Sequence, residues 1–263
     1  MEQRICFSVL ALKPKYRSLA KNLASDLARL SPDIPIVVGT DAPEAFRQHD
    51  NVQAFKLNKT GVLHCYNDKR FVIAKALQTF TTVVQIDADT RLNEPIPSNI
   101  DPVAGIGGSY LANMVAHSEK YNRKRLGHLK KLAHKLELTP DSVTFVGEAL
   151  FAVTVKGDQM QKFFYEWDRI ARYLEINGVH AGEGNAIGLA AAKSGLTITA
   201  PTWISNIKKS SEHLDASRIT APKSATPKLY SPKLEKLQRS LSFHYRLNRS
   251  RLIAVRHFNF YYR

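Results

Sequence analysis

The first third of the chain alternates apolar runs with segments of helical periodicity, and this alternation restricts the fold more than any other feature. The apolar runs have the length of buried strands and end at charged, proline or glycine residues, whereas leucines recur every three or four residues between the first two runs. The expected strands cover residues 5–12, 34–39, 52–57 and 83–86, and the expected helices cover residues 16–30 and 68–79. Repetition of strand and helix in this order predicts an α/β domain with a parallel sheet.

Two aspartates, Asp87 and Asp89, end the last of these apolar runs. Alternate residues of an extended chain share one side, so both carboxylates can hold one hard divalent cation. The alternative is a structural role, because an aspartate after a strand often caps a helix or forms a turn. Residues 11–13 and Asp41 also follow predicted strands, and parallel sheets bind ligands at these carboxyl ends. This convergence favours a binding site.

The composition fits a globular protein with an anionic partner. The chain has 263 residues, 44% of them hydrophobic, and a formal charge of +15, so nucleic acid, an anionic membrane surface and phosphorylated substrates are all compatible with it. No apolar stretch approaches the roughly 20 residues that span a bilayer, and we expect a cytoplasmic protein. The cysteines, Cys6 and Cys65, lack metal-ligand spacing and are expected to be buried apolar residues.

The second half contains further polar candidates among less regular elements. We expect a loose stretch at 105–110, a basic helical segment at 118–138, a strand-like segment at 143–155 that contains Glu148, and helices at 160–176 and 186–194. Glycines flank Glu183 just before the last of these helices and permit close approach to a ligand. Residues 205–232 are expected to form a mobile loop. The basic, aromatic end of the chain is compatible with a peripheral membrane segment, a nucleic-acid patch or a closing helix with a solvated face.

The strand that runs into Ile86-Asp87-Ala88-Asp89 resembles the Asp-x-Asp signature of GT-A glycosyltransferases, closest in pattern to retaining families 8 and 6. No Gly-x-Gly-x-x-Gly or P-loop sequence competes with this interpretation. The resemblance covers roughly residues 5–200. It implies a Rossmann-like nucleotide-binding half and a mixed, mainly parallel sheet flanked by helices. The corresponding domain division is a catalytic domain at 1–204, with a nucleotide-sugar half at 1–100 and an acceptor half at 101–204, and a basic extension at 205–263.

The resemblance also implies roles for individual residues. Arg70 matches an arginine on the helix before the metal strand, and with Lys69 it would contact the donor diphosphate. Glu183 and Asn185 fall where family 8 has a segment that touches the donor sugar, although Asn185 replaces a carboxylate there. Glu148 lies in a strand similar to the one that lines the acceptor pocket. His257 resembles the histidine that completes the metal site, but the Gly and Lys-Pro-Trp residues that follow it in the family are missing.

The resulting hypothesis is a metal-dependent glycosyltransferase that uses a nucleotide-sugar, with a UDP-sugar favoured. Asp87, Asp89 and His257 would hold Mn²⁺ or Mg²⁺, and Ala11 and Asp41 would contact the nucleoside. Glu148 or Glu183 would act in catalysis, with Asn185 in the same catalytic group. The acceptor would be a glycan or glycolipid, with peripheral contact to an anionic membrane. The alternatives are a sugar nucleotidyltransferase and a non-enzymatic protein that binds nucleic acid or an anionic surface.

Overall fold

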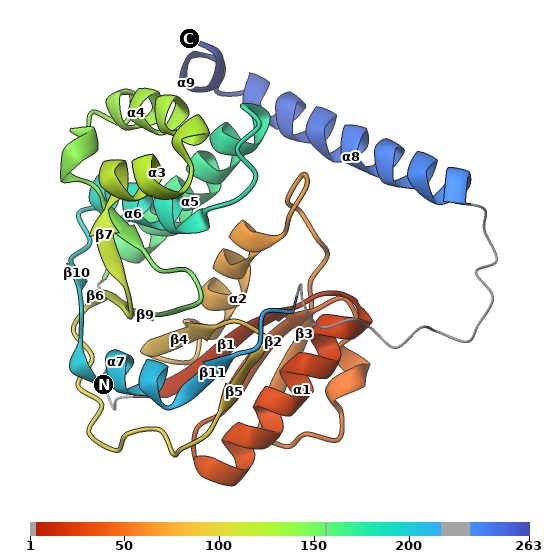
Figure 1. The fold of residues 1–263 in the computed structure, drawn as a ribbon, viewed down its shortest axis with the longest axis vertical. Coiled ribbons are helices and arrows are strands. Elements are labelled where there is room, and N and C mark those ends of the chain that lie inside the picture. The colour runs from red at the N-terminus through yellow and green to blue at the C-terminus, as the bar shows by residue number, and fades with distance from the viewer. Residues whose placement is uncertain (1–3, 156, 217–231) are drawn as a thin grey trace.

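Seven strands form one mixed sheet at the centre of the molecule, in the order β10-β6-β9-β4-β1-β2-β3 (Figure 1). The computed structural model describes residues 4–155, 157–216 and 232–263. β9 pairs antiparallel with β4 and β6, and the other pairs in this sheet are parallel. The strands of this sheet are β1 (Ile5–Ala11), β2 (Ile36–Thr40), β3 (Val52–Lys56), β4 (Thr82–Ile86), β6 (Gly105–Gly108), β9 (Leu150–Thr154) and β10 (Ile198–Thr199). The expected mainly parallel α/β fold is confirmed.

Helices cover both faces of this sheet because its strands carry apolar side chains on both sides. In β1, Phe7 packs into the core beneath α1, whereas its neighbour Cys6 packs into the core on the side of α2 and α5. The α-helices are α1 (Lys13–Leu30), α2 (Lys69–Ala76), α3 (Met114–Tyr121), α4 (Leu126–Lys135), α5 (Gln159–Ile176), α6 (Glu183–Ser194), α7 (Thr202–Lys209), α8 (Pro232–Val255) and α9 (Phe258–Tyr262). Short 3₁₀ helices cover Pro43–Phe46, Tyr66–Asp68, Arg123–Arg125 and Pro140–Ser142.

Two small antiparallel pairs complete the strands and correct several expectations. β5 (Thr90–Leu92) pairs with β11 (Ser211–His213), and β7 (Leu111–Asn113) pairs with β8 (Thr144–Val146). The segment expected as one strand at 143–155 is therefore two strands, β8 and β9, with a turn between them. Part of the loop expected at 205–232 is ordered as α7 and β11, and residues 217–231 lie outside the described residues. The stretch 105–110 contains β6, and the basic segment 118–138 is divided between α3 and α4.

The last two helices, α8 and α9, lie on the same side of the molecule as α5, and α8 contacts α5 (Figure 1). Ala254 of α8 and Tyr261 of α9 are buried in the same hydrophobic core as α5 and α6. The amino-terminal part of α8 extends away from the sheet (Figure 1). None of the helices in the described part of the chain is both long enough and apolar enough to cross a bilayer.

Candidate functional site

A cleft of about 650 Å³ lies at the carboxyl ends of β1, β2 and β4. In the strand order, β2 and β3 follow β1 in one direction along the sheet, whereas β4 lies on the other side of β1 and the chain continues from it to β6 in the opposite direction. Such reversals of direction open the crevices in which α/β sheets bind ligands. The polar and aromatic side chains of the cleft are those of Lys13, Tyr16, Asp41, Asn58, Lys59, His64, Tyr66, Lys69, Asp87, Asp89, Glu148, Glu183, His213 and Asp215.

Three of these residues, Asp87, Asp89 and His213, can supply metal ligands. Each offers one ligand atom, and these atoms all lie within 4.8 Å of one another. The two aspartates sit in the turn between β4 and β5, and the pairing of β11 with β5 brings His213 opposite Thr90. One oxygen of Asp89 accepts a hydrogen bond of 2.7 Å from the Ala216 N–H, and the other lies 3.6 Å from His213 Nδ1. Carboxylate and imidazole ligands suit Mn²⁺, and the carboxylates also suit Mg²⁺.

The histidine that lies with the two aspartates is His213, and not the expected His257. His257 precedes α9, where it is exposed, and it does not belong to the group formed by the two aspartates and His213. Sequence reasoning missed His213 because β11 is only three residues long and lies in a segment rich in serine and lysine. A strand this short has no periodicity to detect, and the pairing across more than a hundred residues has no local signal.

Lys69 connects the aspartate turn to two other elements. Its Nζ atom lies 2.7 Å from Asp87 Oδ1 and 3.0 Å from Glu183 Oε1, and it donates a 3.0 Å hydrogen bond to the Glu148 carbonyl. The side chain is only 7% exposed. Burial opposes its charge, but Asp87 and Glu183 together raise the pKa of Lys69, so it stays protonated. The amino group thereby holds the ends of β4 and α6 together at the base of the cleft.

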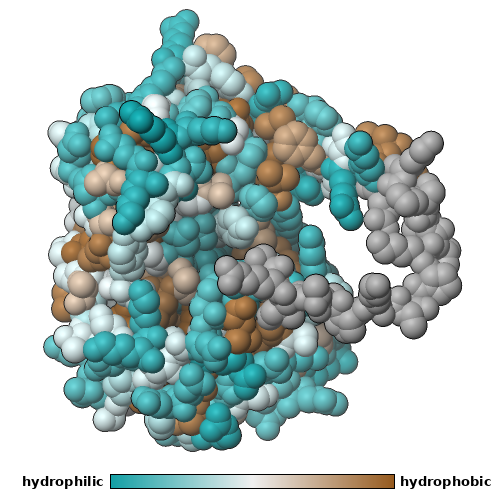
Figure 2. All heavy atoms as spheres, viewed as in Figure 1, coloured by the Kyte–Doolittle hydropathy of each residue, from teal (hydrophilic) through white to brown (hydrophobic). Residues whose placement is uncertain are grey.

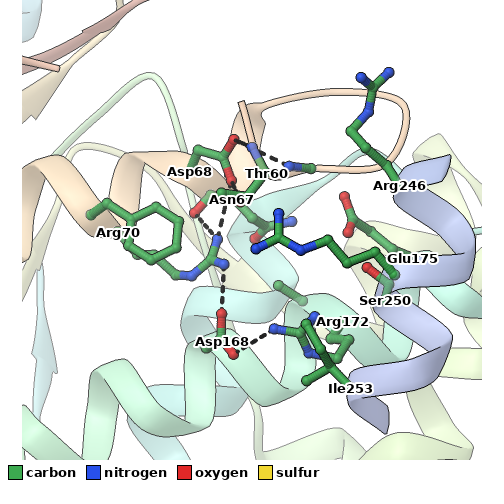
Figure 3. Close-up of a pocket in the computed structure, with 14 residues that line it drawn as sticks. Thr60, Asn67, Asp68, Arg70, Asp168, Arg172, Glu175, Arg246, Ser250 and Ile253 are labelled. Carbon is green, nitrogen blue, oxygen red and sulfur yellow. Dashed lines mark hydrogen bonds and ion pairs between the residues drawn. The ribbon is translucent and has the colours of Figure 1, made fainter. Parts of the chain in front are cut away.

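Arg70 points away from the cleft, in contrast to the expected contact with a donor diphosphate. It lies in a separate cavity of about 160 Å³ between α2, α5 and α8 (Figure 3). Its guanidinium donates 2.6 Å hydrogen bonds to Asp168 and to the Asn67 carbonyl, and it lies 3.5 Å from Asp68. Successive helical residues point about 100° apart, so Lys69 and Arg70 face different sides of α2. Arg70 therefore joins α2 to α5.

Glu148 lies in the turn between β8 and β9 rather than inside a strand, and it lines the cleft. Burial, together with the nearby charge of Glu183, raises the pKa of Glu148 to about 7. Its Oε2 atom is buried and has no hydrogen-bond partner among the described residues. A carboxyl group with this pKa can both accept and donate a proton near neutral pH. Glu183 differs from it because Lys69 neutralises its charge.

Asn185 and the glycines around Glu183 contact other parts of the protein. Asn185 is 1% exposed, does not line the cleft, and its amide donates to the Gly182 carbonyl at 3.1 Å. Gly182 has a φ of +83°, and a Cβ atom there would meet the Arg125 guanidinium at 1.9 Å. At Gly184 a Cβ atom would lie 2.1 Å from the Val146 carbonyl oxygen. These glycines therefore allow close packing within the protein.

One side of the cleft is formed where β1 and β2 end. Asp41 accepts hydrogen bonds of 3.1 and 3.2 Å from the Lys13 N–H and one of 2.5 Å from Arg17. Although burial acts in the opposite direction, these contacts lower the pKa of Asp41, which is therefore ionised at neutral pH. Ala11 is fully buried, and the cleft is lined by its neighbours Leu10, Leu12 and Lys13 instead. Lys13 has a φ of +75°, a strained conformation that concentrates at functional sites.

No protein-family model matches the sequence, and no curated protein matches it significantly. The residues of the cleft are therefore the basis for a functional proposal. Four carboxylates, those of Asp87, Asp89, Glu148 and Glu183, face this cleft near a single buried amine, that of Lys69. An excess of carboxylates in a concave site attracts cations. The cleft is thus suited to hold a divalent cation and, beside it, the phosphates that such a cation binds.

Proposed function

We propose that the protein is a metal-dependent glycosyltransferase that uses a nucleotide-sugar donor, with a UDP-sugar favoured. The observation that carries this proposal is the meeting of Asp87, Asp89 and His213 in the cleft beyond β4. The Asp-x-Asp sequence, the position of the cleft at a reversal of the sheet and the resemblance to GT-A enzymes all support it.

The proposed metal site uses both aspartates and His213 to hold Mn²⁺ or Mg²⁺. A bound cation supplies a positive charge that stabilises the negative charge of the leaving diphosphate. Lys13 and Lys59 also line the cleft and add positive charge for the phosphates, in the role expected of Arg70. Asp41 is assigned to the hydroxyl or N–H groups of the nucleoside.

On the acceptor side, Glu148 is the residue best suited to handle a proton. In the proposed transfer, a bond forms between the acceptor oxygen and the anomeric carbon, the bond from that carbon to the diphosphate breaks, and the acceptor hydroxyl passes its proton to the Glu148 carboxylate. Glu148 lines the cleft and has a carboxyl oxygen free of hydrogen bonds to the described residues. Glu183 is held by Lys69, so we assign it to the donor sugar. A glycan or glycolipid is the proposed acceptor.

Calorimetric titration with UDP, in the presence and absence of Mn²⁺, tests this proposal. We expect binding that requires the ion and that weakens at least about tenfold in Asp89→Asn, because one ligand carboxylate is lost. Asp33→Asn is the matched control, because Asp33 is exposed and precedes the amino end of β2, whereas the cleft lies at the carboxyl ends of the strands. Absence of UDP and GDP binding in the wild-type protein with Mn²⁺ would refute the proposal.

A further inference from the structure

One face of α8 holds this helix against the body of the protein. Ser250 and Ala254 are buried, and Arg246, Ser250 and Ile253 line the cavity shared with α5 (Figure 3). Arg246 Nε also donates a 3.0 Å hydrogen bond to the Val62 carbonyl. These contacts fix the rotation of α8 about its own axis. They therefore decide which residues of the helix face outward.

The opposite face of α8 carries an exposed apolar stripe. Its members are Leu237, Leu241, Tyr245, Leu252 and Val255, with exposed fractions between 54% and 72%. At 3.6 residues per turn these positions fall within an arc of about 80°, and the centre of this arc lies roughly 180° from Ser250. One uncharged polar residue, the exposed Asn248, lies within the same arc. Within the described part of the chain nothing buries this stripe. Figure 2 shows hydrophobic side chains among hydrophilic ones along α8.

Basic residues border the stripe on both sides. At the same 100° per residue, Arg249 and Arg256 flank one side and Arg251 flanks the other. Glu235 is the only acidic residue in the sequence from 232 to 263. Two copies of α8 would bring like charges together, which disfavours pairing of the helix with itself. A nucleic-acid surface would place cations at the centre, whereas here the arc is uncharged and mainly apolar and the cations lie at its edges.

We propose that α8 lies flat on an anionic lipid bilayer, with the apolar stripe inserted at the level of the headgroups. An apolar centre and a cationic border are typical of helices that lie in the membrane interface. The long arginine side chains can reach outward to lipid phosphates while their methylene groups stay among apolar atoms. Phe258 and Tyr262 of α9, the helix that follows α8, are also exposed aromatic residues. This inference is independent of the glycosyltransferase proposal, because it concerns a surface outside the cleft.

Sedimentation with lipid vesicles tests the inference. We expect the full-length protein to bind vesicles of phosphatidylcholine that contain phosphatidylglycerol, to bind pure phosphatidylcholine weakly, and to dissociate at high salt. The double variant Leu241→Asp/Leu252→Asp should reduce the partition coefficient by roughly tenfold or more, because two charges enter the stripe. Val103→Asp is the matched control, because Val103 is 51% exposed and lies outside α8. Thermal unfolding of each variant verifies that the fold is intact.

Several results would overturn the inference. Absence of wild-type binding to the anionic vesicles would contradict it directly. Equal vesicle binding by the wild type and the double variant would place any lipid contact elsewhere on the molecule. A third such result is a wild type that fails to bind vesicles and instead forms a dimer or binds DNA or RNA. If the double variant abolished that interaction, the stripe would be assigned to a protein or nucleic-acid partner.

Discussion

Lys69 and Arg70 are neighbours in α2, but they lie in two polar clusters that differ in their balance of positive and negative side chains. The Lys69 cluster at the cleft contains the carboxylates of Asp87, Asp89, Glu148 and Glu183. The Arg70 cluster beneath α8 contains four arginines, Arg70, Arg172, Arg246 and Arg249, and three carboxylates, those of Asp68, Asp168 and Glu175 (Figure 3). The first cluster therefore has excess negative charge, whereas the second has nearly as many carboxylates as guanidinium groups.

This difference suits the Lys69 cluster to binding a ligand and the Arg70 cluster to joining helices to each other. In the Arg70 cluster, Arg70 and Arg172 both pair with Asp168, and the Asp68 carboxylate accepts hydrogen bonds from the N–H groups of Thr60 and Gly61. In the Lys69 cluster, the Lys69 amine pairs with Asp87 and Glu183, and Glu148 keeps an oxygen without a hydrogen bond from the described residues. Of the two neighbours, Lys69 lines the cleft and Arg70 lines the cavity beneath α8, which differs from the position expected of Arg70 from the sequence.

Removal of the Lys69 amine should have the largest effect on stability. Lys69→Met leaves Asp87 and Glu183 without their common partner, and loss of one member of a buried ion pair costs about 3–5 kcal/mol. Urea denaturation should show this decrease in the free energy of unfolding. Lys193→Met is the control, because its partner Glu137 is 86% exposed and its loss should leave stability unchanged. Equal stability of Lys69→Met and the wild type would contradict the proposed role of Lys69.

The Arg70 cluster should give stability a pH dependence through Glu175. Burial, together with the charge of Asp68, raises the pKa of Glu175 from 4.5 to about 7, although the Val62 N–H donates to it. Between these pH values the folded protein binds more protons at Glu175 than the unfolded chain does, so this residue's contribution to stability falls as the pH rises.

Glu175→Gln should therefore be about as stable as the wild type near pH 4.5 and more stable by roughly 2–3 kcal/mol near pH 8. Glutamine can still accept the hydrogen bond from Val62. Urea denaturation at both pH values measures the difference between the two proteins. A difference that stays the same at both pH values would show that Glu175 does not titrate in this way.

Replacement of Arg70 should cost less and should leave the cleft intact. Arg70→Met removes the hydrogen bond to the Asn67 carbonyl and the ion pairs with Asp168 and Asp68. We expect a loss of about 2 kcal/mol because the closer partner, Asp168, is 39% exposed. Mn²⁺-dependent UDP affinity, measured by calorimetry, should be unchanged. If the variant had wild-type stability but lost most of that affinity, the result would indicate that Arg70 contacts the donor after all.

The elements that sequence could predict are those with local signals. The strands and helices between residues 5 and 86 follow from apolar runs and helical periodicity, and the structure reproduces them within a few residues. Asp87 and Asp89 were identifiable because charge ends an apolar run abruptly. Glu148 was singled out because it interrupts a similar run, although the interruption proved to be a turn between two strands.

The missed features depend on contacts between distant parts of the chain. His213 reaches the aspartates through the pairing of β11 with β5, two three-residue strands that are separated by more than a hundred residues. The choice between Lys69 and Arg70 depends on the rotation of α2 against the sheet, which the packing of Val72, Ile73 and Ala76 fixes. A spacing between residues carries no information about that rotation.

Mn²⁺-dependent UDP affinity in two histidine variants, His213→Ala and His257→Ala, tests the central claim most directly. The structure places His213 with Asp87 and Asp89, whereas His257 is exposed before α9. The account predicts that His213→Ala weakens ion-dependent UDP binding by roughly tenfold or more and that His257→Ala binds like the wild type. Loss of binding in His257→Ala, with His213→Ala unaffected, would contradict the site described for the cleft.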